Sequence, residues 1–113
     1  MRSFAIRVMI LNPPDSAKSA TVECLVDTGA PYSQLPSDLL HSLGITPFNE
    51  RSSIFADGRR RICRVGRAEF IHDTRHTPAL VVFGEAGPPA LLGTMTLEGL
   101  GLSVDPIGKR LTQ

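Results

Sequence analysis

The chain has 113 residues, of which 42% are hydrophobic, and its 12 basic and 11 acidic residues leave a formal net charge of +1. This length accommodates one domain with one hydrophobic core, so we treat residues 1–113 as a single domain. No uninterrupted apolar run approaches the ~20 residues of a membrane-spanning helix, and we expect no membrane partner.

The densest positive run is Arg59-Arg60-Arg61, followed by Arg64 and Arg67. This run has no neighbouring aromatic platform of the kind that proteins binding single-stranded nucleic acids use. A composition close to neutral also lacks the strong basic excess of a nucleic-acid-binding protein. We therefore expect no nucleic-acid partner.

The first seven residues include a charge at Arg7, and no small-residue cleavage site follows them. They do not resemble a signal peptide, and the expected location is cytoplasmic. Cys24 and Cys63 both lie in apolar strand patterns, and two cysteines are too few for a disulfide framework. Both are expected to be buried free thiols.

Residues 4–10 alternate with apolar side chains on one face, which is the period of a strand. Two prolines and several turn formers interrupt the pattern over residues 12–16, and residues 20–26 resume it with Val22 and Cys24 on the same side. The two segments are predicted to pair as a hairpin that directs Asp27 toward the centre of the fold.

Further along the chain, a short helix is predicted over residues 36–44, where leucines share one face and a glycine follows the end. An Asp-Gly pair predicts a hairpin turn at residues 56–59. The other predicted elements are strands at residues 51–55, 60–71, 77–83 and 90–93, a short helix at residues 94–100, and a closing hairpin of residues 102–105 and 110–112. Together they predict a mostly β, closed-barrel-like domain with one or two short helices.

The stretch from Cys24 to Ala30 carries the strongest functional signal. An apolar strand runs directly into Asp27-Thr28-Gly29, which places a carboxylate at the end of a buried strand and a sharp turn behind it. Asp, Thr and Gly are also common turn formers, so the triplet alone is compatible with a simple turn. However, Leu91-Leu92-Gly93 downstream repeats the pattern of an apolar pair that ends in glycine.

These two motifs resemble those of the retropepsin-like (clan AA) aspartic proteases, and most of all their single-domain bacterial and archaeal forms. The resemblance extends from about Thr21 to Leu111 and implies the closed β-barrel of the acid protease fold. It implies that Asp27 is catalytic, and that a hairpin closes over bound peptide as a flap. The residues that it assigns to active-site support are Thr28, Gly29, Ala30, Leu91, Leu92 and Gly93, and those that it assigns to the flap are Phe55, Ala56, Asp57 and Gly58. Retroviral members follow the second glycine with an arginine-containing helix, whereas this chain has Gly93-Thr94-Met95.

Two other routes to peptide hydrolysis find little support in the sequence. A cysteine nucleophile is disfavoured because Cys24 and Cys63 lie in apolar strands, where a thiol is inert. His72 and His76 are four residues apart, but the segment between them resembles a turn that enters a strand, where this spacing does not bring two rings onto one face. We expect no metal and no cofactor.

The carboxylate route needs a second acid beside Asp27, and the chain contains one Asp-Thr-Gly. A two-fold homodimer would supply that acid from the partner. Two carboxyl groups about 3 Å apart share a proton, so that one activates water while the other polarises the scissile carbonyl, as is general for aspartic proteases. The sequence thus predicts an aspartic-type endopeptidase, a hydrolase of peptide or protein substrates. The alternative is a non-catalytic dimeric peptide-binding or scaffolding module of the same fold.

Overall fold

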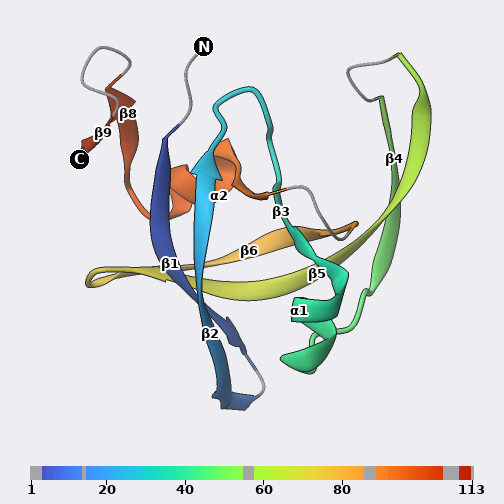
Figure 1. Cartoon of the computed structure of the whole chain (residues 1–113), viewed down its shortest axis with the longest axis horizontal. Coiled ribbons are helices and arrows are strands. Elements are labelled where there is room, and N and C mark those ends of the chain that lie inside the picture. Colours follow the sequence, from blue (N-terminus) through green and yellow to red (C-terminus); the bar gives the residue numbers. More distant parts are fainter. Residues whose placement is uncertain (1–3, 14, 55–57, 86–88, 106–109, 113) are drawn as a thin grey trace.

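The computed structural model describes residues 4–13, 15–54, 58–85, 89–105 and 110–112. Its elements, in chain order, are β1 (Ala5–Asn12), β2 (Asp15–Val26), β3 (Ser33–Pro36), α1 (Ser37–Ser42), β4 (Asn49–Ile54), β5 (Arg60–His72), β6 (Arg75–Gly84), β7 (Ala90–Leu92), α2 (Thr94–Gly99), β8 (Ser103–Asp105) and β9 (Arg110–Thr112). The predicted mostly β class with two short helices is therefore confirmed (Figure 1).

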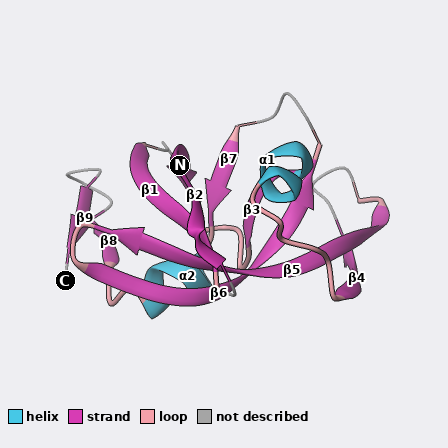
Figure 2. Ribbon diagram, turned by 90° about the horizontal axis from the view of Figure 1, so that it is seen from below, coloured by secondary structure: helices cyan, strands magenta, loops and turns pink. Residues whose placement is uncertain are grey.

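Seven strands form one sheet in the order β1-β2-β7-β3-β6-β5-β4. An additional pairing of β1 with β5 closes the first six strands into a barrel and leaves β4 outside it. In Figures 1 and 2, β5 and β6 curve across the molecule, and β1 meets β5 toward the turn that joins these two strands, where residues 9–11 pair with residues 69–71. Strands β8 and β9 form a separate two-stranded sheet. The closed barrel predicted from the sequence is confirmed.

The core lies inside this barrel and follows the alternation of its strands. Val8 and Ile10 on β1, and Cys24 and Val26 on β2, are each at most 1% exposed. Their neighbours in the sequence face outward, which is the period-2 pattern that the sequence showed. Burying each of the larger aliphatic side chains contributes roughly 1.5–3 kcal/mol. The alternation thereby fixes which face of β2 is the core and which face is open.

The structure corrects two strand predictions. Strand β2 begins at Asp15 rather than at residue 20, because β1 and β2 continue to pair to Leu11 with Ser19 and, after an irregularity in the register, to Asn12 with Asp15. In residues 15–19 the one apolar residue is Ala17, and the side chains of Asp15, Ala17, Lys18 and Ser19 are exposed, so this part of the strand carries no hydrophobic period. Strand β3 was not predicted at all. It has four residues and pairs in parallel with β6, from Ser33 with Val81 to Pro36 with Gly84.

The predicted turns are confirmed where the structure describes them. Gly44, with φ +76°, follows α1, and Asp73, with φ 55°, lies in the tight turn between β5 and β6. The closing hairpin is confirmed as β8 and β9, whose connecting residues 106–109 lie outside the described part. Among the described residues, no helix is both long and apolar enough to cross a membrane.

Candidate active site

Asp27 directly follows β2, at the point where this strand runs beside β7. The two strands are parallel, with Leu25 opposite Leu91 and Val26 opposite Leu92. The Asp27 backbone N–H donates a hydrogen bond of 3.0 Å to the Leu92 carbonyl. The structure thus brings together the two motifs that are 64 residues apart in the sequence, as the resemblance implied.

The loop after Asp27 is closed on itself by hydrogen bonds. Gly29 N–H donates to Asp27 Oδ1 at 2.9 Å, and Ala30 N–H donates to the Asp27 carbonyl at 3.3 Å. A carboxylate oxygen that accepts a backbone N–H has its direction fixed and its charge partly satisfied. Asp27 itself is half-buried, whereas Thr28 and Gly29 are exposed. The carboxylate is therefore oriented by its own loop yet open to solvent.

A buried pair of hydroxyl groups beneath this loop was not predicted. Ser33 Oγ accepts the Gly93 N–H at 3.0 Å and lies 2.6 Å from Thr96 Oγ1. Both side chains are 0% exposed. The pair links β3, the second glycine and α2, so it joins the supports of the two motif loops. A serine that faces inward from a strand would have indicated a buried hydroxyl group. That orientation could not be inferred from the sequence because β3 was not predicted as a strand.

Two backbone hydrogen bonds and one glycine complete the support. Thr94 N–H donates to Ala30 O at 2.9 Å, and Met95 N–H donates to Pro31 O at 3.1 Å. At Gly93, a Cβ would lie 2.5 Å from the Tyr32 carbonyl carbon and 2.6 Å from its oxygen. Only glycine allows this approach between the two loops. The need for glycine at position 93 therefore has a steric basis.

The predicted flap corresponds to the hairpin of β4 and β5, which pair from Asn49 with Val65 to Ile54 with Arg60. Phe55, Ala56 and Asp57 lie outside the described residues. Gly58 adopts φ +81°, and no described heavy atom lies within 4 Å of a Cβ built there.

Two arginines of this hairpin lie over aromatic rings of the same chain. The Arg67 guanidinium lies 5.6 Å from the Phe48 ring centroid. A second arginine, Arg51 on β4, lies 5.7 Å from the Tyr32 ring centroid. These are cation–π contacts within the chain, and each ring has an arginine over it.

The two cysteines differ, which corrects the expectation that both are buried. Both are free, but only Cys24 is fully buried, and Cys63 is half-buried. Burial raises the pKa of the Cys24 thiol to about 12. A thiol in this state is a poor nucleophile, as was inferred from its apolar strand.

Because Cys24 is protonated in the folded protein, we expect it to resist thiol reagents at neutral pH. Its folded pKa of about 12 exceeds the ordinary value of 9.0, so its contribution to stability is complete below pH 9.0 and is lost as the pH rises from there toward 12. Thiol titration with an aromatic disulfide reagent, with and without denaturant, checks the first point. Thermal unfolding between neutral and alkaline pH measures the loss of stability. A Cys24→Val variant should lose less stability than the wild type as the pH rises above 9.0.

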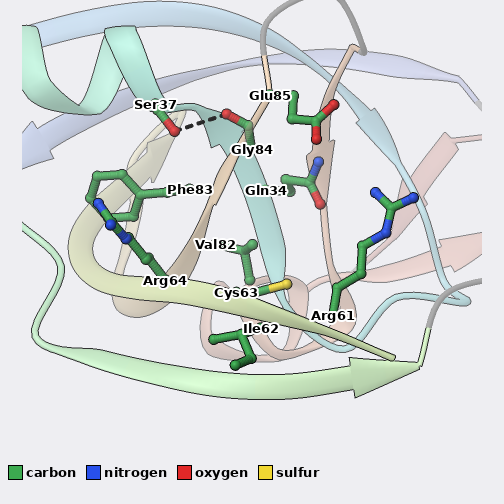
Figure 3. A pocket seen from close by; sticks show the side chains of 10 residues that line it. All are labelled: Gln34, Ser37, Arg61, Ile62, Cys63, Arg64, Val82, Phe83, Gly84 and Glu85. Atoms are coloured by element: carbon green, nitrogen blue, oxygen red, sulfur yellow. Dashed lines mark hydrogen bonds between the residues drawn. The ribbon is translucent and has the colours of Figure 1, made fainter. Parts of the chain in front are cut away.

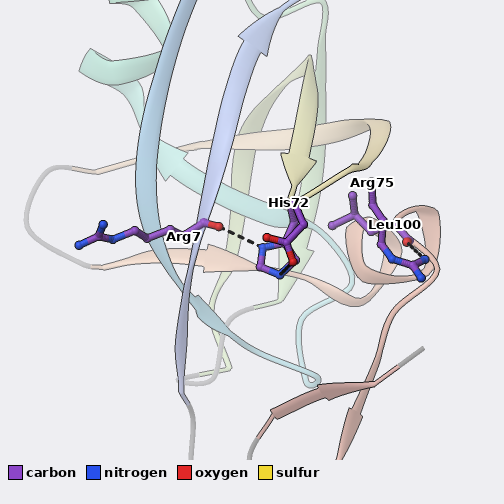
Figure 4. A network of polar contacts seen from close by, with 5 residues as sticks. Arg7, His72, Arg75 and Leu100 are labelled. Carbon is purple, nitrogen blue, oxygen red and sulfur yellow. Dashed lines mark hydrogen bonds and ion pairs between the residues drawn. The ribbon is translucent and has the colours of Figure 1, made fainter.

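His72 and His76 take part in separate local contacts, and Figure 4 shows the contact of His72 with Arg7. His72 Nδ1 lies 3.1 Å from the Arg7 carbonyl, and its Nε2 lies 3.8 Å from Asp73. His76 Nδ1 lies 3.7 Å from Glu69. Among the described residues, no group of three or more His, Cys, Asp or Glu side chains is placed to hold a metal ion. Figure 4 also shows the neighbouring Arg75, which donates to the Leu100 carbonyl at the end of α2.

Comparisons with known proteins agree with this arrangement. A model of the aspartyl protease family matches residues 16–96, and no curated protein sequence matches the chain. The structure is similar to that of the EIAV protease complexed with the inhibitor HBY-793, with a TM-score of 0.60 and 21% identity over 92% of this chain and 93% of that one. It is also similar to a retropepsin-like aspartic protease from Rickettsia conorii, with a TM-score of 0.58 and 19% identity over 91% of this chain and 76% of that one. The chain therefore belongs to the aspartyl protease family and has the retropepsin-like fold.

Proposed function

We propose that the protein is an aspartic endopeptidase that acts as a homodimer, with one Asp27 from each protomer in a shared site. The observation that carries this proposal is the position of Asp27. Its carboxylate lies at the junction of β2 and β7, is oriented by the Gly29 N–H at 2.9 Å, and remains half-exposed. A turn-forming aspartate also accepts the N–H two residues on, so the support for the proposal lies in the pairing of β2 with β7 beside Asp27 and in the buried hydroxyl pair beneath its loop.

The proposed reaction uses water and the two carboxyl groups alone. The charged Asp27 takes a proton from a water molecule held between the two acids, and the water oxygen bonds to the scissile carbonyl carbon. The protonated Asp27 polarises the carbonyl oxygen and stabilises the tetrahedral intermediate. Transfer of a proton to the amide nitrogen then breaks the C–N bond and releases an acid and an amine, so that one water is consumed for each bond cleaved.

The partner protomer is required because the chain contains one Asp-Thr-Gly. The two exposed residues that follow Asp27, Thr28 and Gly29, are suited to contact the same loop of a second copy. The resemblance assigns Thr28 to hydrogen bonds across the dimer axis. In this proposal the support residues Ala30, Leu91, Leu92 and Gly93 act within each protomer.

The proposal predicts a bell-shaped dependence of peptide cleavage on pH. Catalysis needs the singly protonated pair, because one acid must accept a proton while the other donates a hydrogen bond. The maximum is expected on the acidic side of neutrality. The measurement is the cleavage rate of a denatured protein or peptide over a pH series. An optimum well above neutrality, lost with a thiol reagent or a chelator, would exclude the Asp27 mechanism.

The hairpin of β4 and β5 is proposed to close over bound peptide, and Gly58 offers a test. Its φ of +81° strains any β-branched residue, although no atom of the described residues lies within 4 Å of an added Cβ. Gly58→Val should lower kcat/KM clearly. Its unfolding temperature should fall only by the effect of the local strain, because that strain is confined to the turn. Gly58→Asn is the control, since asparagine tolerates this conformation. Unchanged kcat/KM in Gly58→Val would remove the flap role.

A further inference from the structure

The loop that follows Asp27 ends at Tyr32, whose backbone is held in place. A Cβ at Gly93 would lie 2.5 Å from the Tyr32 carbonyl carbon, so the two backbones pack directly against each other. The next residue, Ser33, is 0% exposed and accepts the Gly93 N–H at 3.0 Å. Tyr32 is itself half-buried. Its side chain therefore extends from a fixed point close to the proposed catalytic acid.

The hairpin of β4 and β5 is attached to the sheet along one side. Strand β4 is the end strand of the seven-stranded sheet and, among the described strands, it pairs with β5 alone. Strand β5 pairs with β6 from Val65 onward. Ahead of that point a cavity of about 410 Å³ is lined by Arg61 and Cys63 of β5, Gln34 of β3 and Val82 of β6. In Figure 3, Arg61 and Cys63 extend from β5 on the side where Gln34 and Val82 lie.

Arg51, on β4, reaches from this hairpin to Tyr32. Its Nη1 donates a hydrogen bond of 3.1 Å to the Tyr32 hydroxyl, and its Cζ lies 5.7 Å from the centroid of the Tyr32 ring. Arg51 pairs with Cys63, which lines the cavity. The guanidinium thus joins an end strand to a loop whose position is fixed. Arg51 is exposed, and a contact at the surface is weak enough to break when a peptide enters.

From this contact we infer that Arg51 and Tyr32 form a latch, which holds the hairpin of β4 and β5 to the active-site loop and so positions the hairpin for peptide binding. The effect on peptides rests on the proposed function. A hairpin that is already held near the loop loses less conformational freedom when a peptide binds, so the peptide binds more tightly. Arg51 and Tyr32 act through the hairpin, and they are positioning residues. Their loss should leave the chemical step nearly unchanged.

Arg67 and Phe48 provide the matched comparison. The Arg67 Cζ lies 5.6 Å from the Phe48 ring centroid, almost the same distance as in the latch. Phe48 directly precedes β4 and Arg67 lies in β5, so this contact stays within the hairpin. If a contact between arginine and an aromatic ring only stabilised the hairpin, losing either arginine would have the same consequences. If the latch exists, the loss of Arg51 alone releases the hairpin from the loop.

The kinetic experiment measures KM and kcat with a peptide that the wild type cleaves, taken from a digest of denatured casein. Arg51→Gln should raise KM about fivefold and change kcat by less than about twofold. Tyr32→Phe keeps the ring and loses the hydrogen-bond acceptor, so it should raise KM by about threefold, and Arg51→Lys should restore part of the wild-type KM. Adding Tyr32→Phe to Arg51→Gln should have no further effect, because both changes break the same contact. Arg67→Gln removes the same charge and should keep the wild-type KM. An unchanged or lower KM in Arg51→Gln, or equal effects of Arg51→Gln and Arg67→Gln, would overturn the inference.

Two further measurements need no substrate. Tyr32 is the only tyrosine and the chain has no tryptophan, so the intrinsic fluorescence reports on Tyr32 alone. Arg51→Gln should change this emission, whereas Arg67→Gln should not. Hydrogen exchange of residues 49–54 should be about threefold faster in Tyr32→Phe, while residues 5–12 keep the wild-type rate. Because Tyr32 lies outside the hairpin, this change would show that the loop holds it.

These measurements separate the inference from the proposed function. If the wild type cleaves no peptide while the emission and the exchange change as expected, the proposed function fails and the latch stands. If the wild type cleaves peptides but neither the emission nor the exchange changes, the latch is excluded and the proposed function stands.

Discussion

Asp27→Asn is expected to abolish peptide cleavage, with a fall in kcat/KM of at least about 10³-fold, because asparagine can neither accept the proton from water nor protonate the leaving amine. The substitution nearly preserves the size of the side chain. Asparagine Oδ1 can still accept the Gly29 N–H that now bonds the carboxylate at 2.9 Å. The loss of activity should therefore occur without a loss of structure.

Thermal unfolding and light scattering provide the control for this variant. Two carboxylates brought together across a dimer axis repel one another, and asparagine removes this repulsion. We expect the Asp27→Asn protein to be dimeric and at least as stable near neutral pH as the wild type. If Asp27→Asn cleaved peptides at the wild-type rate, the catalytic group would have to lie elsewhere in the molecule.

Gly93→Ala is expected to give the largest loss of stability among single substitutions at the site. The new Cβ would lie 2.5 Å from the Tyr32 carbonyl carbon and 2.9 Å from the Ala30 oxygen, and both of these atoms are backbone. To relieve this crowding, residues 30–32 would have to move away from α2. That movement would break the hydrogen bonds from Thr94 to Ala30 and from Met95 to Pro31. A cost of about 3 kcal/mol or more follows, together with the loss of activity.

Chemical denaturation of Gly93→Ala measures this cost directly. Gly58→Ala is the matched control, because it introduces the same methyl group at φ +81° with no described atom within 4 Å. That control isolates backbone strain, which is worth about 1 kcal/mol. Equal destabilisation of the two variants would show that the close packing of the two motif loops is unimportant.

The barrel was predictable because its long strands are regular. Val8 and Ile10, and Cys24 and Val26, alternate with outward-facing residues, and this period is visible without any tertiary information. Strand β3 was not predictable in the same way. Its four residues include a proline and two polar side chains, and they form a strand only because β6 and β7 provide partners on both sides.

In the candidate site, too, the residues marked by local sequence were predictable, and those that depend on distant contacts were not. Asp27 and Gly93 were found because motifs mark them in the sequence. Ser33 and Thr96 were missed because a buried hydroxyl pair depends on two residues 63 positions apart that each resemble an ordinary polar residue. Strand β3, which carries Ser33, was itself missed, because its pairing with β6 and β7 depends on residues far away in the sequence.

Mixing wild-type and Asp27→Asn chains tests most directly whether two protomers share one active site. The mixed chains are unfolded and refolded together so that they pair at random, and peptide cleavage is measured at a fixed amount of wild-type chain. If both acids are required, an equal amount of Asp27→Asn chain should reduce the activity to about half, and a tenfold excess should reduce it to about one tenth, because mixed dimers are inactive. Activity that stays constant as Asp27→Asn chain is added would show that each protomer works alone, and it would contradict the shared Asp27 site.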